Sequence, residues 1–97
     1  MRMITQGDVN AAARALVALP DHGARSALLR ALLCDARRAA RHRCRTGRID
    51  PALGNGTLMA AALARPHVPA LDLSDTRHLQ ALEEVISGLI ALRLEGE

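Results

Sequence analysis

Apolar residues recur at helical spacing in four stretches of the chain, and no stretch sustains the apolar–polar alternation typical of a half-buried strand. The first stretch follows Thr5, whose hydroxyl can cap a helix, with Asp8 three residues later as its capping-box partner. Because Pro20 cannot continue a helix, we expect the first helix to lie between Thr5 and Pro20.

The second stretch predicts a long amphipathic helix that Asp21 caps and that runs to about Thr46, with Gly47 as its C-terminal stop. At steps of about 100° per residue, one side of this helix gathers the apolar residues Leu28, Leu29, Leu32, Ala36 and Ala39. The opposite side gathers a group that we call the Arg face: Arg30, Arg37, Arg38, Arg41, Arg45 and Arg48. Arg25 and Arg43 fall near the two ends of the apolar side, where their stems can extend outward to water.

Residues 47–57 form a connector that one proline and several glycines punctuate as turns. Thr57 can cap a short helix over residues 58–64. The run Gly-Asn-Gly-Thr at 54–57 resembles an anion-binding turn, but it lacks the lysine and the longer glycine spacing of a nucleotide-binding loop. A tight turn with a helix cap is the favoured interpretation.

The fourth stretch begins at Ser74 or Asp75 and predicts a helix to about Leu94. Its apolar residues occupy more than one side, which is wider than a single packing partner covers. We therefore expect this helix to pack on the long second helix and also to face a neighbouring subunit. The residues expected to mediate oligomerisation are Leu79, Leu82, Ile86, Leu89 and Ile90.

These elements predict an all-α fold in which residues 1–97 form a single domain, a small helical bundle of three main helices plus a short connector helix. The 97 residues are 49% hydrophobic but include no Phe, Tyr or Trp, the residues that bury the largest areas in a core. A monomer would have a thin core, and oligomerisation is the usual remedy in a small helical chain. We therefore expect a homo-oligomer.

Positive charge is concentrated in one part of the chain. All thirteen basic residues are arginine, and six of them lie between positions 37 and 48. Residues 1–70 contain 11 Arg and 4 Asp, a net charge of +7, whereas residues 71–97 contain 2 Arg and 6 acidic residues, a net charge of −4. A basic body with an acidic end indicates contact with nucleic acid or head-to-tail pairing of subunits.

Three roles are open for the Arg face. Guanidinium groups fit phosphate oxygens, so the face can bind double-stranded DNA or another polyanion weakly and without sequence preference. It can instead be solvated, or it can pair with acidic side chains, for which the candidates are Asp35, Asp50, Glu83 and Glu84. We do not expect base reading, because the chain has no helix-turn-helix, zinc-finger or basic-zipper pattern and no aromatic side chain to stack on bases.

Catalysis and metal binding are not expected. The four histidines are dispersed, and no second ligand pair accompanies His42 and Cys44 at zinc-site spacing. Cys34 and Cys44 lack a definable base, and ten residues of helix place them about 15 Å apart, too far for a disulfide. We predict a protein that is not an enzyme and holds no cofactor and no metal. With no membrane-spanning apolar run and no secretory signal, it is expected to be cytoplasmic and to make no membrane contact.

Residues 54–62 read Gly-Asn-Gly-Thr-Leu-Met-Ala-Ala-Ala, between an Arg-rich helix and an apolar one. Over about residues 41–64 this arrangement resembles the short helical proteins of alphaproteobacterial gene transfer agents, phage-like particles that package host DNA, and above all their small terminase component. The resemblance implies a non-catalytic packaging subunit that oligomerises, presents DNA to the large terminase subunit and regulates that motor. Phage small terminases usually carry a helix-turn-helix. This chain lacks one, so only non-specific DNA contact carries over, and no catalytic residue does.

The function predicted from the sequence is thus an oligomeric DNA-packaging adaptor of small-terminase type. Its Arg face would contact DNA or the large terminase subunit. Two alternatives stand beside it: a small non-specific nucleic-acid-binding protein, and a purely protein-binding adaptor whose Arg face meets an acidic partner.

Overall fold

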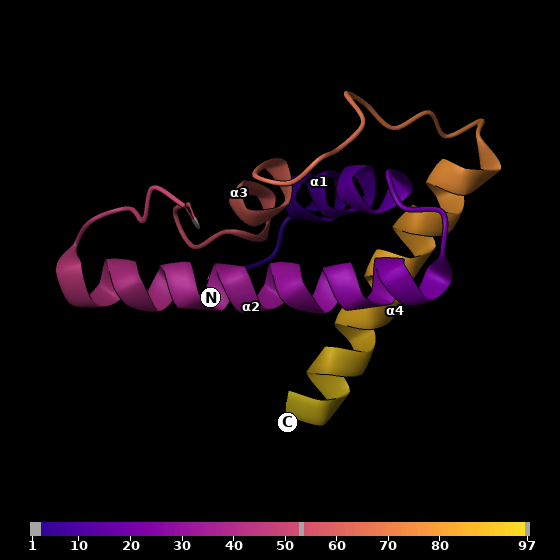
Figure 1. The fold of residues 1–97 in the computed structure, drawn as a ribbon. Coiled ribbons are helices and arrows are strands. Elements are labelled where there is room, and N and C mark those ends of the chain that lie inside the picture. The colour runs from indigo at the N-terminus through magenta and orange to yellow at the C-terminus, as the bar shows by residue number, and fades with distance from the viewer. Residues whose placement is uncertain (1–2, 53, 97) are drawn as a thin grey trace.

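The computed structural model describes residues 3–52 and 54–96 and shows four helices there: α1 (Gln6–Val17), α2 (His22–Thr46), α3 (Leu58–Leu63) and α4 (Thr76–Gly96). These residues include no strand, only an isolated backbone bridge between Asp50 and Gly54. The predicted all-α fold, with three main helices and a short one, is confirmed (Figure 1).

Local capping chemistry sets the helix ends where the sequence predicts them. Thr5 is the N-cap of α1 and forms a reciprocal capping box with Asp8. The side chains of Asp21 and Thr57 cap α2 and α3 by accepting hydrogen bonds from backbone N–H groups of the first turn. Gly47 ends α2 in the left-handed conformation, with φ of 70°, which glycine adopts without steric cost.

The central helix of the fold is α1. It lies beside α3 and packs on α4, and α2 runs below α1 and α3 (Figure 1). This position buries residues on several sides of α1, namely Ala11, Ala12, Ala13, Ala15 and Leu16. The largest fully buried side chains of the described residues are Leu16, Leu32, Leu58 and Val85, so the core is built from alanine and a few aliphatic residues. Such a core is thin, as the composition indicates.

Helix α4 packs mainly on α1, not on α2 as the sequence suggests. It crosses α2 instead of running beside it, and its C-terminal turns extend beyond α2 (Figure 1). The crossing is close at Gly88, where a β-carbon would collide with Cδ2 of Leu29. The two helices therefore approach closely at Gly88, but this contact covers only one short part of α4.

Two arginines outside the Arg face hold the segment between α3 and α4. Arg14 Nε donates to the carbonyl oxygen of Val68 at 2.9 Å, and the Val68 N–H donates back to the Arg14 carbonyl at 3.1 Å. Arg65, just after α3, forms an ion pair with Asp35 on α2 at 2.8 Å. These contacts hold the segment that follows α3 against α1 and α2.

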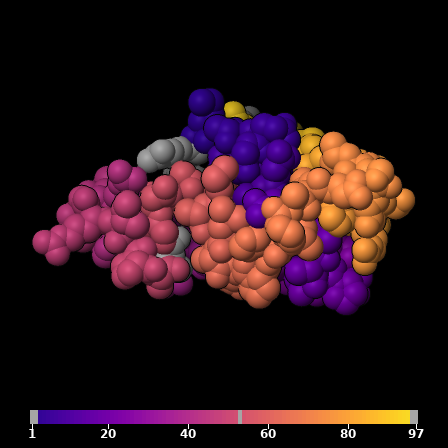
Figure 2. All heavy atoms as spheres, turned by 90° about the horizontal axis from the view of Figure 1, so that it is seen from above, coloured from indigo at the N-terminus to yellow at the C-terminus, as the bar shows by residue number. Residues whose placement is uncertain are grey.

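The molecule is elongated, with principal extents of 42 × 31 × 22 Å. The end of α2 and the connector that follows it form its narrower end (Figure 2). None of the four described helices is both long enough and apolar enough to cross a membrane.

Candidate nucleic-acid interface

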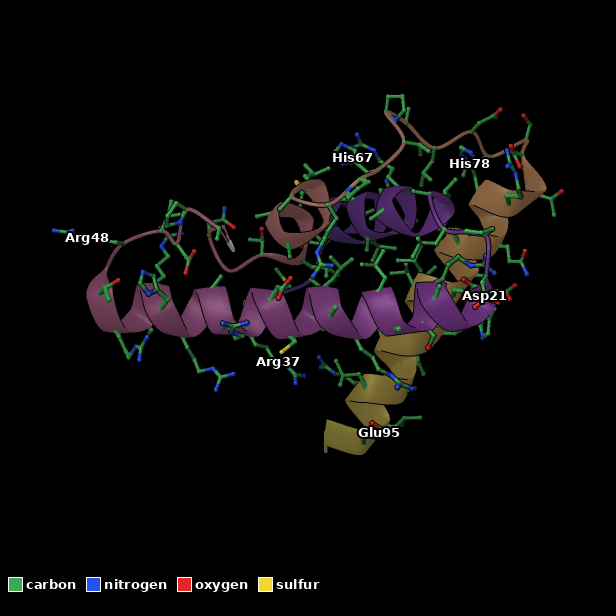
Figure 3. The ribbon with its side chains drawn as sticks, in the orientation of Figure 1. Asp21, Arg37, Arg48, His67, His78 and Glu95 are labelled. Atoms are coloured by element: carbon green, nitrogen blue, oxygen red, sulfur yellow. The ribbon has the colours of Figure 1, made fainter. Side chains whose placement is uncertain are left out.

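The Arg face lies along the solvent side of α2. The buried side of this helix, which faces the core, consists of Leu29, Leu32, Leu33, Ala36 and Ala39. All six arginines of the Arg face are exposed, and Arg37 points away from α1 and α3 (Figure 3). Arg30 and Arg45 are 15 residues apart, so the helical part of the face is about 22 Å long.

Arg48 does not continue the helical face. Because α2 ends at Thr46 and Gly47 turns the backbone into the left-handed region, Arg48 belongs to the connector. Its side chain points outward from the far end of the molecule (Figure 3). The structure thus brings together five of the six predicted arginines, and Arg48 extends the charge around the end of the helix.

Two of the carboxylates proposed as partners for the Arg face pair with other arginines. Asp35 pairs with Arg65, and Glu84 accepts from Arg25 Nε at 2.6 Å and from Arg25 Nη2 at 2.9 Å. Arg25 therefore points to α4. The sequence-based expectation that its side chain extends outward to water is wrong. In residues 3–52 and 54–96, no side chain of the Arg face makes a hydrogen bond or an ion pair. The charge of the face is not neutralised inside this part of the chain.

An open hollow of about 490 Å³ lies at the C-terminal part of the Arg face. It is lined by Arg38, Arg41, His42, Cys44, Arg45 and Asp50. Asp50 reaches it from the connector, where its Oδ1 accepts a hydrogen bond from the Ala52 N–H at 2.7 Å. Three guanidinium groups against one carboxylate leave a net positive hollow that favours an anion. The sequence does not predict that His42 and Asp50 border it, since this depends on how the connector folds back.

The connector returns to α2 through a close glycine contact. Gly56 is buried with φ of 93°, and a β-carbon on it would lie 2.9 Å from Cα of Ala40. Asn55 Oδ1 stabilises the turn by accepting hydrogen bonds from the Thr57 N–H at 3.1 Å and the Thr57 hydroxyl at 2.7 Å. The interpretation of 54–57 as a tight turn with a helix cap agrees with this geometry.

A single carboxylate serves the starts of two helices. Asp8, only 6% exposed, accepts from the Thr5 N–H at 2.8 Å through Oδ2 and from the Met59 N–H at 3.0 Å through Oδ1. The Ala60 N–H is in turn bound by Thr57 at 3.1 Å. Because its own chain uses these N–H groups, the start of α3 does not offer them to an anion. The sequence indicates the capping box but not the link from α1 to α3.

The residues predicted to mediate oligomerisation differ in how far their side chains are exposed. Leu79, Ile86 and Ile90 are 46%, 44% and 56% exposed, whereas Leu82 and Leu89 are partly buried against the core of their own chain. An apolar hollow of about 340 Å³ is lined by Val9, Ile86, Leu89, Ile90, Arg93 and Leu94. The sequence does not identify Val9 as part of this surface, because its position on the first helix is equally typical of a core residue.

Both cysteines, Cys34 and Cys44, are free and exposed. Across the described ranges, no three His, Cys, Asp or Glu side chains come together in a group that could hold a metal ion.

Comparison with known proteins identifies a family to which the chain is similar. No curated protein and no solved structure matches the chain. The model of a family described as a domain of unknown function, DUF7742, matches residues 2–89. Since this match covers most of the chain, the protein belongs to the DUF7742 family.

Proposed function

We propose that this protein is a non-catalytic DNA-packaging adaptor of small-terminase type, which assembles as an oligomer and contacts double-stranded DNA through the Arg face. The observation that carries the proposal is the alignment of Arg30, Arg37, Arg38, Arg41 and Arg45 on one exposed side of α2, without partners in the described part of the chain. Aligned like charges repel one another, and an external polyanion removes that cost.

The length of the Arg face suits a phosphate backbone. Duplex DNA carries a charge about every 1.7 Å of its axis, so a face about 22 Å long can reach several phosphates at once. Each phosphate that an arginine neutralises releases condensed counterions, which makes the affinity strongly dependent on salt.

The side chains of α2 favour backbone contact over base reading. The chain has no helix-turn-helix, zinc-finger or basic-zipper pattern that would place α2 in the major groove, and no aromatic residue on which bases could stack. The expected complex is therefore weak and without sequence preference.

A role in packaging, as opposed to DNA binding in general, rests on the resemblance of about residues 41–64 to gene-transfer-agent small terminases. In this role the protein docks on a large terminase subunit, which supplies the ATPase and the nuclease. The basic body and acidic C-terminal segment support contacts of both kinds, with DNA and with protein.

The DNA contact is tested by titrating a fluorescent duplex with the protein at several salt concentrations and following anisotropy. The wild type is expected to lose affinity steeply as salt rises, and R37A/R38A/R41A to bind at least about tenfold more weakly. Arg77→Ala is the control, because this exposed arginine pairs with Asp75 at the start of α4, away from the Arg face. Equal binding by the triple variant and the wild type would contradict the proposal.

The packaging role needs a second test. The protein, expressed with the large terminase encoded in the same cell, should co-purify with it. Binding to duplex DNA without this association would favour a general nucleic-acid-binding protein. Association without DNA binding would favour a purely protein-binding adaptor.

A further inference from the structure

The exposed side of α4 has the spacing of a helix-pairing seam. Five residues follow one another at alternating steps of four and three, and we call them the α4 seam: Leu79, Glu83, Ile86, Ile90 and Arg93. Such spacing is that of the contact positions of two-stranded coiled coils. The side of α4 that faces the core instead carries Ala81 and Val85, which are 1% and 0% exposed. The seam therefore lies on the side of α4 that its own chain does not cover.

The chain exposes more surface than a compact monomer of its size. A folded monomer of 10.4 kDa is expected to expose about 5,400 Å², whereas this chain exposes 6101 Å². The excess of about 700 Å² is close to the roughly 800 Å² that each partner buries in an interface of standard size. Exposed apolar side chains on α4 account for part of it, and they continue to Leu94, which is 75% exposed.

We propose that the α4 seam binds the α4 seam of a second copy of this chain in antiparallel orientation, about a two-fold axis level with position 88. In this register Ile86 of each chain lies opposite the partner's Ile90. At both ends of the contact, Glu83 lies opposite the partner's Arg93. The interface is self-complementary, as a two-fold dimer requires.

Charge complementarity selects the antiparallel orientation. A parallel pair would place Glu83 against the same residue of the partner and Arg93 against its own copy, so that like charges meet at both ends. The antiparallel pair replaces both repulsions with attractions. Arg93 already interacts within its own chain, but a guanidinium has five N–H donors and can bind a further carboxylate.

The hollow beside the α4 seam provides room for the partner helix. Val9 of α1 borders this hollow together with Ile86, Ile90 and Leu94, so the partner's α4 would contact α1 as well as α4. Helix α2 crosses α4 at Gly88, on the side of α4 that faces the core of its own chain. The remaining helices of each subunit therefore lie on the outer sides of the α4 pair and leave the seam accessible.

This pairing supplies a specific interface for the assembly in the proposed function, but it does not depend on what the Arg face binds. Its tests are carried out without DNA. A protein that dimerises and binds no duplex would overturn the proposed DNA contact and leave the α4 pairing intact.

The apolar part of the interface is tested by sedimentation of the full chain with interference optics, since the chain lacks Trp and Tyr. The wild type should sediment as a dimer at micromolar concentration, and Ile90→Asp should raise the dimer dissociation constant about tenfold or more. Ile49→Asp is a matched control, because Ile49 is also 56% exposed but lies in the connector. Far-UV circular dichroism checks that each variant remains helical. A monomeric wild type, an assembly larger than a dimer, or equal effects of the two substitutions would overturn the proposal.

The register is tested by exchanging charges. Glu83→Arg alone places two arginines opposite each other at each end of the antiparallel contact, and Arg93→Glu alone places two carboxylates there, so each should weaken the dimer. The double variant E83R/R93E restores opposite charges and should return the dissociation constant to within about threefold of the wild-type value. If each single variant dimerises as well as the wild type, or if the double variant fails to recover, the antiparallel register is wrong.

Discussion

Glu84 on α4 accepts two hydrogen bonds from the guanidinium of Arg25 near the start of α2, one from Nε and one from Nη2. Each side chain is 13% exposed, and His22 Nδ1 lies 2.9 Å from Oε1 of the same carboxylate. Fifty-nine residues separate the two partners in sequence, so this pair joins the start of α2 to a helix that α2 otherwise only crosses. The hydrogen bonds from Arg25 lower the pKa of Glu84, and the contact with His22 adds to this effect.

Acid should remove the stabilisation that this pair provides. Because the pKa of Glu84 in the folded state lies below its ordinary value of 4.5, the contribution is complete above that value and is lost as pH falls through the folded pKa. Glu84→Gln should therefore lower the midpoint of thermal unfolding at neutral pH, and the difference from the wild type should shrink in acid.

Circular dichroism over a series of pH values measures this effect. Glu95→Gln, at an exposed position near the end of α4, is expected to follow the wild type at every pH. A difference between Glu84→Gln and the wild type that stays constant from neutral pH into acid would contradict the assigned role of the ionised carboxylate.

Removal of the Asp8 carboxylate should destabilise the fold more than removal of an exposed helix cap. Asp8→Ala leaves the N–H groups of Thr5 and Met59 without their acceptor, and we expect it to reduce the free energy of unfolding by about 2–4 kcal/mol. Asp21→Ala removes an exposed cap and should reduce it by about 1 kcal/mol. Urea denaturation followed by far-UV circular dichroism gives both values. Similar losses in the two variants would show that Asp8 does not link α1 to α3.

Alanine substitutions at two glycines in the left-handed region distinguish the energetic cost of backbone strain from the cost of a steric collision. Gly47→Ala adds a β-carbon with nothing within 4 Å, so we expect only the conformational cost of about 1 kcal/mol. Gly56→Ala adds the same strain and pushes the connector away from Ala40, so its cost should exceed that of Gly47→Ala by at least about 1 kcal/mol. The same denaturation measurement compares them, and equal costs would mean that the connector can move away from α2 freely.

Replacing arginine by lysine on the Arg face distinguishes DNA from a protein partner. Non-specific phosphate binding depends on charge, so R37K/R38K/R41K should keep the salt dependence of duplex binding. The corresponding triple alanine variant should reduce the slope of log affinity against log salt by about three. Lysine cannot replace the planar fork of arginine on a carboxylate. A lysine variant that loses association with the large terminase but still binds duplex would show that the same face serves an acidic protein.

The helix ends were predictable because capping is local. Thr5, Asp21, Gly47 and Thr57 each act on groups within a few residues, so the sequence contains the whole interaction. The segregation of arginines on one side of α2 was predictable for the same reason, since helical periodicity alone determines it.

The contacts between distant elements were not predictable in this way. The pairing of Arg25 with Glu84 depends on where α4 crosses α2, and neither helix determines that alone. Arg48 likewise lies on the helical wheel of the Arg face, but its position depends on the left-handed turn at Gly47. Periodicity indicates which side of a helix is apolar, whereas the packing of small alanine side chains determines which neighbour covers it.

The carboxylate of Asp8 has a consequence for affinity. It ties α3, and with it the connector beside the Arg face, to α1, the helix on which α4 packs. In the proposed antiparallel pair no flexible linker would join the two Arg faces, so the geometry of the dimer would determine the effective concentration of the second face. If the Arg faces bind DNA as proposed, a duplex shorter than the span between them would engage one face, whereas a longer duplex would engage both. The length of a DNA molecule, independent of its sequence, would then determine how tightly the protein binds it.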